Sequence, residues 1–177
     1  MSVFDLKVSF EASAFHRPLH YQEEYSAALF KNLNQNNMIQ VISGIATALV
    51  IIFFTALLSK QFSTKLIATT MLCSIAFIYV GFSLKDNPVS SIILEVLVAL
   101  VFYCIAVIGY AKQNFLIAFG IILHGIWDIL HHDALIVKTD IPGYWPLYCL
   151  IVDVLLGIYF FIVFRSQKLS LNQDRNN

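Results

Sequence analysis

The sequence has little charge and no excess of either sign. Only 12% of its 177 residues are charged, and 11 basic residues balance 11 acidic ones, whereas about 25% charged residues is usual for a soluble domain. A chain without net charge has no extended positive field, so we expect no nucleic-acid partner. Hydrophobic residues make up 59% of the sequence, which favours a membrane protein over a soluble one.

The sequence also lacks the marks of secretion and of a disulfide scaffold. The first strongly apolar run begins near Met38, and no basic stretch with a short apolar region precedes it, so we predict no cleaved signal peptide. The cysteines Cys73, Cys104 and Cys149 all lie inside apolar runs. This placement favours small hydrophobic side chains over disulfides.

What the sequence does have is a series of long apolar runs. They cover residues 38–58, 66–84, 91–111, 115–132 and 146–164, and each is close to the roughly 20 residues that a helix needs to cross a bilayer. Backbone polar groups in lipid must pair within the chain, which favours helices. The sequence predicts an all-α polytopic membrane bundle of about five transmembrane helices.

The regions flanking these runs divide the chain into three parts. We predict an extramembrane or interfacial segment over residues 1–37, a transmembrane bundle over 38–165, and a polar, disordered tail over 166–177. With five spans the termini lie on opposite sides, and the side of the C-terminus carries more lysine and arginine. For a protein of the inner-membrane type, the positive-inside rule then predicts a cytoplasmic C-terminus.

The fourth apolar run ends in the sequence HGIWDILHH, which concentrates polar side chains on one helical face. His124, Asp128, His131 and His132 follow one another at offsets of 4, 7 and 8 residues from the first. At about 100° per residue they fall within an arc of roughly 100°. Scattered polar residues would not share one face.

Acidic residues on two other predicted helices lie at a similar depth in the membrane as this polar face. Counting about 1.5 Å per residue from the same surface, His124 lies roughly 12 Å deep and Asp128 about 6 Å deep. Glu95 and Asp153, early in the third and fifth runs, reach roughly 6 and 10 Å. A carboxylate at such depth is costly unless paired, protonated or hydrated. We therefore predict that these acids share one polar pocket with His124.

The residue types in this pocket suit a metal site. Imidazole and carboxylate ligands bind zinc and non-haem iron, and the candidate ligands are His124, Asp128, Asp153 and Glu95. His131 and His132, at the mouth, are candidate catalytic residues. Two other interpretations stay open: a metal-free hydrogen-bonded network that carries protons, and a purely structural role in which the histidines stabilise a helix end.

The run HGIWDILHH, followed by IPGYWPLYCLIVDVLLGIY, resembles a family of small bacterial integral membrane proteins of unknown function. The shared pattern is His-Gly-x-Trp-Asp-x-x-His-His, an aromatic and proline-rich loop, and then Cys-x-x-x-Asp, which here ends in Cys149 and Asp153. The resemblance implies membrane embedding and a shared polar site. A looser likeness to alkaline-ceramidase-type membrane hydrolases, which bind zinc through histidines, is analogy alone.

Together these features lead to one working hypothesis and one alternative. The hypothesis is a metal-dependent membrane enzyme, with zinc or iron, that acts on a lipid or other apolar substrate, with hydrolysis favoured over oxidation. The alternative is a non-enzymatic membrane protein that handles protons or ions. Membrane lipids are the expected partners, and a homo-oligomer stays open.

Overall fold

The computed structural model of the chain describes residues 19–85, 88–131 and 141–176. The chain forms two units, Met1–Ile39 and Gln40–Asn177, and the site lies in the second. The described elements are the helices α2 (Leu19–Leu58), α3 (Thr64–Ala76), α4 (Ile78–Ser83), α5 (Val89–Ala111), α6 (Asn114–Leu130) and α7 (Trp145–Asn176). These described ranges contain no strand, and the all-α prediction is confirmed.

Four helical stretches are long and apolar enough to cross a membrane. They are Asn37–Leu58, Thr64–Ser83, Val89–Ala111 and Trp145–Ser170, and they support a multi-pass membrane protein. The fourth predicted span corresponds to α6, an apolar helix of 17 residues. Its length of about 26 Å, at 1.5 Å per residue, is slightly less than the hydrocarbon thickness of about 30 Å.

The second predicted span consists of two helices. Ser63 begins α3 by accepting a hydrogen bond from the Leu66 amide at 3.2 Å, and the helix ends at Phe77, where φ is −91° and ψ is −3°. The chain continues directly into α4. Tyr79, two residues after the break, lies in the protein interior and is only 1% exposed.

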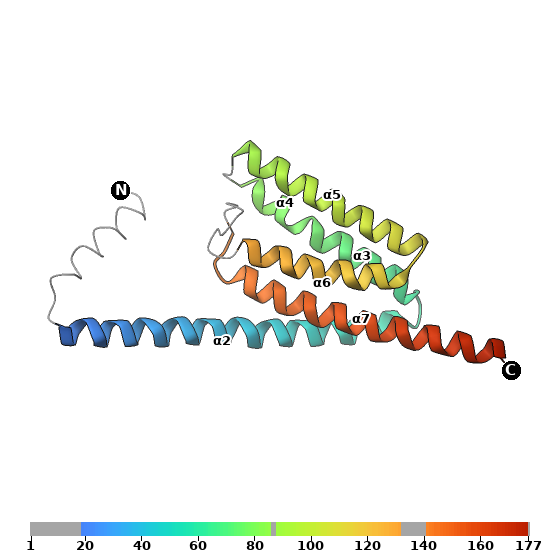
Figure 1. Cartoon of the computed structure of the whole chain (residues 1–177), viewed down its shortest axis with the longest axis horizontal. Coiled ribbons are helices and arrows are strands. Elements are labelled where there is room, and N and C mark those ends of the chain that lie inside the picture. Colours follow the sequence, from blue (N-terminus) through green and yellow to red (C-terminus); the bar gives the residue numbers. More distant parts are fainter. Residues whose placement is uncertain (1–18, 86–87, 132–140, 177) are drawn as a thin grey trace. The chain divides into compact units, whose positions relative to one another are not determined.

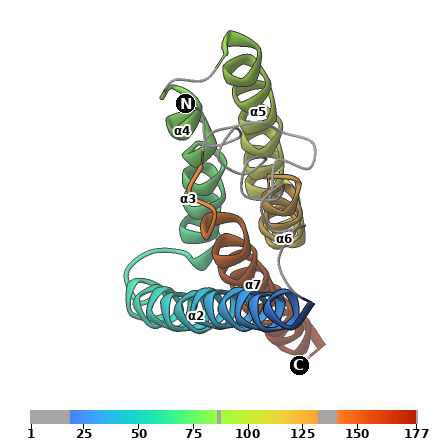
Figure 2. The same cartoon turned by 90° about the vertical axis from the view of Figure 1, so that its left-hand side faces the viewer.

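The central helix of the bundle is α6, which contacts α3, α5 and α7 (Figures 1 and 2). Glycines allow this close packing. A Cβ atom at Gly157 of α7 would lie 2.4 Å from Ile122 Cγ1, and one at Gly120 of α6 would lie 2.7 Å from Leu72 Cδ2. Small residues at helix crossings let backbones approach in the membrane, where packing drives association.

The C-terminal half of α2 packs against α7 through a stripe of small residues. Gly44 and Ala48 are buried, and a Cβ atom at Gly44 would lie 3.0 Å from Ile151 Cβ. The Tyr148 hydroxyl donates a hydrogen bond to Thr47 Oγ1 at 3.0 Å. Large apolar side chains of α2 outside this stripe, such as Phe53, are exposed, as expected for a surface that faces lipid.

The structure differs from the predicted boundaries at the C-terminal end. Helix α7 continues to Asn176, so residues 166–176 are helical where we predicted disorder. This stretch contains neither proline nor glycine, and its two leucines, two glutamines, one lysine and one arginine propagate a helix well. At the other end, residues 19–37 form the start of α2, and residues 1–18 lie outside the described ranges. The interfacial position of this segment stays a prediction.

Candidate metal centre

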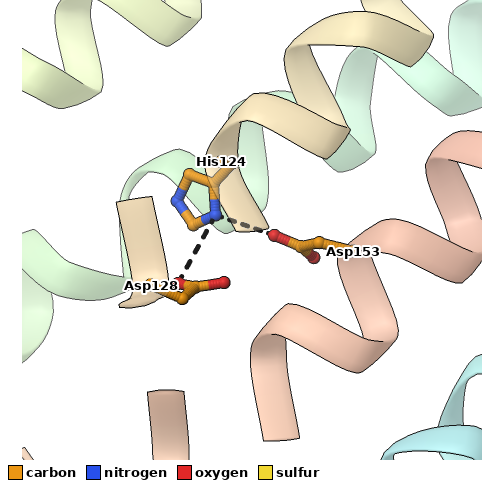
Figure 3. A group of neighbouring side chains, drawn as sticks. All are labelled: His124, Asp128 and Asp153. Atoms are coloured by element: carbon orange, nitrogen blue, oxygen red, sulfur yellow. Dashed lines mark hydrogen bonds and ion pairs between the residues drawn. The ribbon is translucent and has the colours of Figure 1, made fainter. Parts of the chain in front are cut away.

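Three of the predicted ligands converge at one point of the bundle. His124 and Asp128 project from α6, and Asp153 projects from α7 toward them (Figure 3). His124 Nδ1 lies 2.8 Å from Asp153 Oδ2 and 3.8 Å from Asp128 Oδ1. One potential ligand atom from each residue lies within 4.8 Å of the other two. We call His124, Asp128 and Asp153 the triad.

Local sequence explains why these side chains meet. His124 and Asp128 are four residues apart, so both lie on the same face of α6. Gly125 lies between them, and a Cβ atom there would lie 3.2 Å from Asp153 Cβ. The missing side chain lets α7 bring Asp153 close to the face that carries the other two residues.

The triad is isolated from solvent. His124 and Asp153 are each 3% exposed, and Asp128 is 0% exposed. Among the residues that the structure describes, neither oxygen of Asp128 has a hydrogen-bond partner, although the Tyr79 hydroxyl lies near enough to interact with the Asp128 carboxyl. A buried carboxylate without donors is costly. Either a proton or a cation is therefore needed at Asp128.

A second pair of histidine and carboxylate lies beside the triad. His131 Nε2 lies 2.7 Å from Glu95 Oε1, and both side chains are almost completely buried. His131 Nδ1 lies 3.2 Å from the Trp127 carbonyl oxygen, which can only accept a hydrogen bond, so the Nδ1 atom must carry hydrogen. The short contact with Glu95 then needs one more proton, held by the imidazole or by the carboxyl group.

Tyr79 of α4 packs between the two groups. Its ring stacks on His131 with 4.1 Å between ring centroids, and the centroid of His124 is 6.0 Å away. Our sequence analysis missed this residue. The available signal was a lone tyrosine in the middle of an apolar run, since a buried tyrosine hydroxyl usually finds a polar partner.

The remaining predicted residues have separate outcomes. Glu95 binds His131 and does not belong to the triad, because it enters from α5 on the side of α6 where His131 ends the helix. His132 lies outside the described residues.

The donor set of the triad fits a small divalent metal ion. One imidazole nitrogen and two carboxylate oxygens suit zinc and non-haem iron, and three protein ligands leave coordination positions free for water or substrate. His124 Nδ1 and Asp153 Oδ2 are at hydrogen-bond distance, 2.8 Å, and Asp128 Oδ1 lies 3.8 Å from the same nitrogen, so a cation would take the place of the proton between His124 and Asp153. The geometry thus allows a metal centre without a change in helix packing.

Comparison with known proteins identifies the family. A family model described as a family of unknown function (DUF6010) matches residues 39–166. The chain belongs to this family. All triad residues, together with Tyr79, Glu95 and His131, lie inside the DUF6010 match. No curated protein and no solved structure matches the chain.

Proposed function

We propose that this DUF6010 protein holds a zinc or iron ion at the triad and is a membrane-embedded enzyme, with hydrolysis as the favoured reaction. One observation carries the proposal. Among the described residues, neither oxygen of the fully buried Asp128 makes a hydrogen bond, although the Tyr79 hydroxyl lies nearby, and one of these oxygens lies within 4.8 Å of the potential ligand atoms of His124 and Asp153. A cation between these atoms offsets the cost of burying the two carboxylates together.

The neighbouring residues have roles that suit hydrolysis. A zinc or iron ion bound there supplies Lewis-acid chemistry, which makes water a better nucleophile. The pair of His131 and Glu95 holds one proton between Nε2 and Oε1 and can accept or return a proton during a reaction. Tyr79, stacked on His131, fixes the orientation of that imidazole. In this proposal His131 and the predicted residue His132 act as acid or base.

An apolar pocket next to the triad supports a lipid or other apolar substrate. It has a volume of about 280 Å³ and lies between α2, α3, α6 and α7. Ile121, one helical turn from His124, and Val152, next to Asp153, are among its lining residues. This is the chemistry expected of a hydrolase that receives an acyl chain from the bilayer, as in the analogy with alkaline-ceramidase-type enzymes.

A second candidate function is proton or ion handling without chemistry on a substrate. It is favoured by the two direct contacts between histidine and carboxylate, 2.8 Å at His124 and 2.7 Å at His131. Such contacts form proton relays in membrane proteins. The two candidates differ in their dependence on metal, because only the enzyme requires an ion at the triad.

Metal analysis of the purified protein tests the proposal. In detergent, we expect about one zinc or iron ion per chain, measured by inductively coupled plasma mass spectrometry. Asp128→Asn and His124→Ala should lower the metal content at least 10-fold to 100-fold, since even residues that only support a ligand cause losses of this order. Glu95→Gln is the matched control, because Glu95 is an equally buried acid outside the triad.

The outcomes separate the candidates. A folded wild-type protein without metal, after purification without chelators and after incubation with zinc or ferrous iron, contradicts the metal centre and leaves the proton-handling function. Equal loss of metal in Glu95→Gln would return Glu95 to the ligand set. Retention of metal in both triad variants would place the ion elsewhere.

We also propose an inner-membrane location with a cytoplasmic C-terminus. The basic residues near the ends of α3, α5 and α7 support this orientation through the positive-inside rule. A fusion of a reporter that is active only in the cytoplasm to the C-terminus should be active. An inactive reporter in a correctly inserted protein would reverse the orientation.

A further inference from the structure

The end of the bundle opposite the triad carries a concentration of positive charge. Lys112 ends α5, and Arg165 and Lys168 project from the last part of α7, all with exposed side chains. The segments that meet here, residues 57–67, 108–118 and 158–170, contain no aspartate or glutamate. The three cations therefore have no acidic neighbour along the chain that would neutralise them.

Two of these cations, Lys112 and Lys168, line a pocket at the junction of α5, α6 and α7. The pocket has a volume of about 430 Å³ and is lined by Lys112, Lys168 and the polar residues Gln113, Asn114 and Gln167, with Phe115 and Phe164 beneath. Gln167 Nε2 donates to Thr64 Oγ1 at 3.4 Å, which joins α7 to α3 at this end.

A second hollow adjoins this pocket. It has a volume of about 370 Å³, shares Phe115 and Lys168 with the first and adds Phe161, Arg165 and Leu169. Phe115 and Phe161 pack with their ring centroids 5.2 Å apart, and Lys168 Nζ lies 5.9 Å from the Phe115 ring centroid. Both hollows are therefore lined by cations together with aromatic rings.

We propose that this junction binds the phosphate group of an anionic membrane lipid. Lys112, Lys168 and Arg165 contact the phosphate, the amides of Gln113 and Gln167 bond its oxygen atoms or the headgroup, and an acyl chain follows Phe115 and Phe161. Basic pockets between membrane helices recognise anionic headgroups in this way. The site is separate from the triad, because His124 lies ten residues, or about 15 Å, along α6 from Asn114.

Membrane orientation alone does not explain this arrangement. The positive-inside rule concerns the number of cations in the loops and near the ends of spans, and cations spread over the surface would satisfy it equally. Lys60 is such a residue, exposed after α2 and outside both hollows. Lys112 and Lys168 instead line one hollow from two different helices, and the aromatic side chains of Phe115 and Phe164 line the same hollow.

Native mass spectrometry of the detergent-purified protein tests the lipid site. We expect one phosphatidylglycerol molecule to stay bound per chain, with phosphatidylcholine bound much more weakly, because its choline group repels the cations. A Lys or Arg near a membrane surface contributes about fivefold in affinity. The double variant Lys112→Gln, Lys168→Gln should therefore bind phosphatidylglycerol about 25-fold more weakly, whereas Lys60→Gln serves as the matched control and should match the wild type.

Inorganic phosphate, added at constant ionic strength, distinguishes the two sources of the phosphate group. If phosphate displaces phosphatidylglycerol at low millimolar concentration, the site recognises free phosphate and the lipid assignment is wrong. Equal binding of both lipids, or equal weakening by Lys60→Gln and by the double variant, would contradict the site altogether. The metal content of the protein tests the triad independently. A negative result in the lipid-binding experiment therefore does not contradict the proposed metal-dependent enzyme.

Discussion

The two ends of the bundle place their charges in opposite ways. At one end, carboxylates are buried among helices, with Glu95 1% exposed, Asp128 0% and Asp153 3%. At the other end, the side chains of Lys112, Arg165 and Lys168 are exposed around an open junction. Buried charges must find a partner within the fold, whereas exposed lysine and arginine can reach water or headgroups with their long side chains.

This difference indicates which of the two ends is the better candidate for a functional site with a fixed geometry. Buried acids are costly in a membrane protein, and such residues usually mark functional sites. The geometry of the triad is therefore set by packing, through Gly125 and Gly157 on the facing helices. The binding strength of the basic end depends instead on the number of exposed cations and on the electrostatic potential that they create. Substitutions should accordingly have large, local effects at the first end and small, additive effects at the second.

The largest effect on stability is expected from removing the partner of His131. Glu95→Leu leaves the buried imidazole without a polar partner at Nε2, and breaking a buried pair in this way costs about 3 to 5 kcal/mol. Glu95→Gln keeps an amide group whose N–H can donate to Nε2, so it should cost clearly less. Unfolding in detergent, followed by circular dichroism, measures both. Equal stability of the leucine variant and the wild type would show that the pair contributes nothing to the fold.

An intermediate effect on stability is expected from Gly157, the glycine at which α7 packs closely against α6. A Cβ at Gly157 would lie 2.4 Å from Ile122 Cγ1 and 3.0 Å from the Ala118 carbonyl oxygen, so Gly157→Ala must move α7 away from α6. Overpacking of this kind costs about 1 to 3 kcal/mol. Asp153 lies one turn from Gly157, and we expect the variant also to lose metal from the triad.

Gly81 provides the matched control for this substitution. It also lies within a helix, but a Cβ there would meet no atom within 4 Å. Gly81→Ala should be neutral or stabilise the helix by about 0.5 to 1 kcal/mol. If both alanine variants behave alike in unfolding and metal content, close packing of α6 and α7 does not position the triad.

The sequence alone predicts the helical class and all three triad residues, and the helical class and the pair on α6 follow from simple periodicity. Long apolar runs require helices in lipid, and an interval of four residues places His124 and Asp128 on one face. Depth correctly suggested Asp153 as a partner. It could not separate Glu95 from the triad, since depth says nothing about the direction from which a neighbouring helix approaches.

Two further features depended on information that periodicity does not contain. The break at Phe77 divides one apolar run into α3 and α4 and turns Tyr79 toward His131, yet the run contains no proline and its one glycine, Gly81, lies beyond the break. The junction around Lys112 and Lys168 joins residues 56 positions apart in sequence. Both arise from tertiary packing.

The smallest effect on stability is expected at the basic end, and this final prediction sharpens the contrast most directly. Lys112→Gln together with Arg165→Gln removes two exposed charges whose side chains water can solvate equally well after substitution. Surface changes of this kind usually stay within about 0.5 kcal/mol, so the unfolding transition in detergent without added lipid should not move measurably. The same variant should gain less stability than the wild type when phosphatidylglycerol is added, since a ligand stabilises only the state that binds it. A large loss of stability in plain detergent would mean that these cations hold the helices together, and the proposed difference between the two ends would then be wrong.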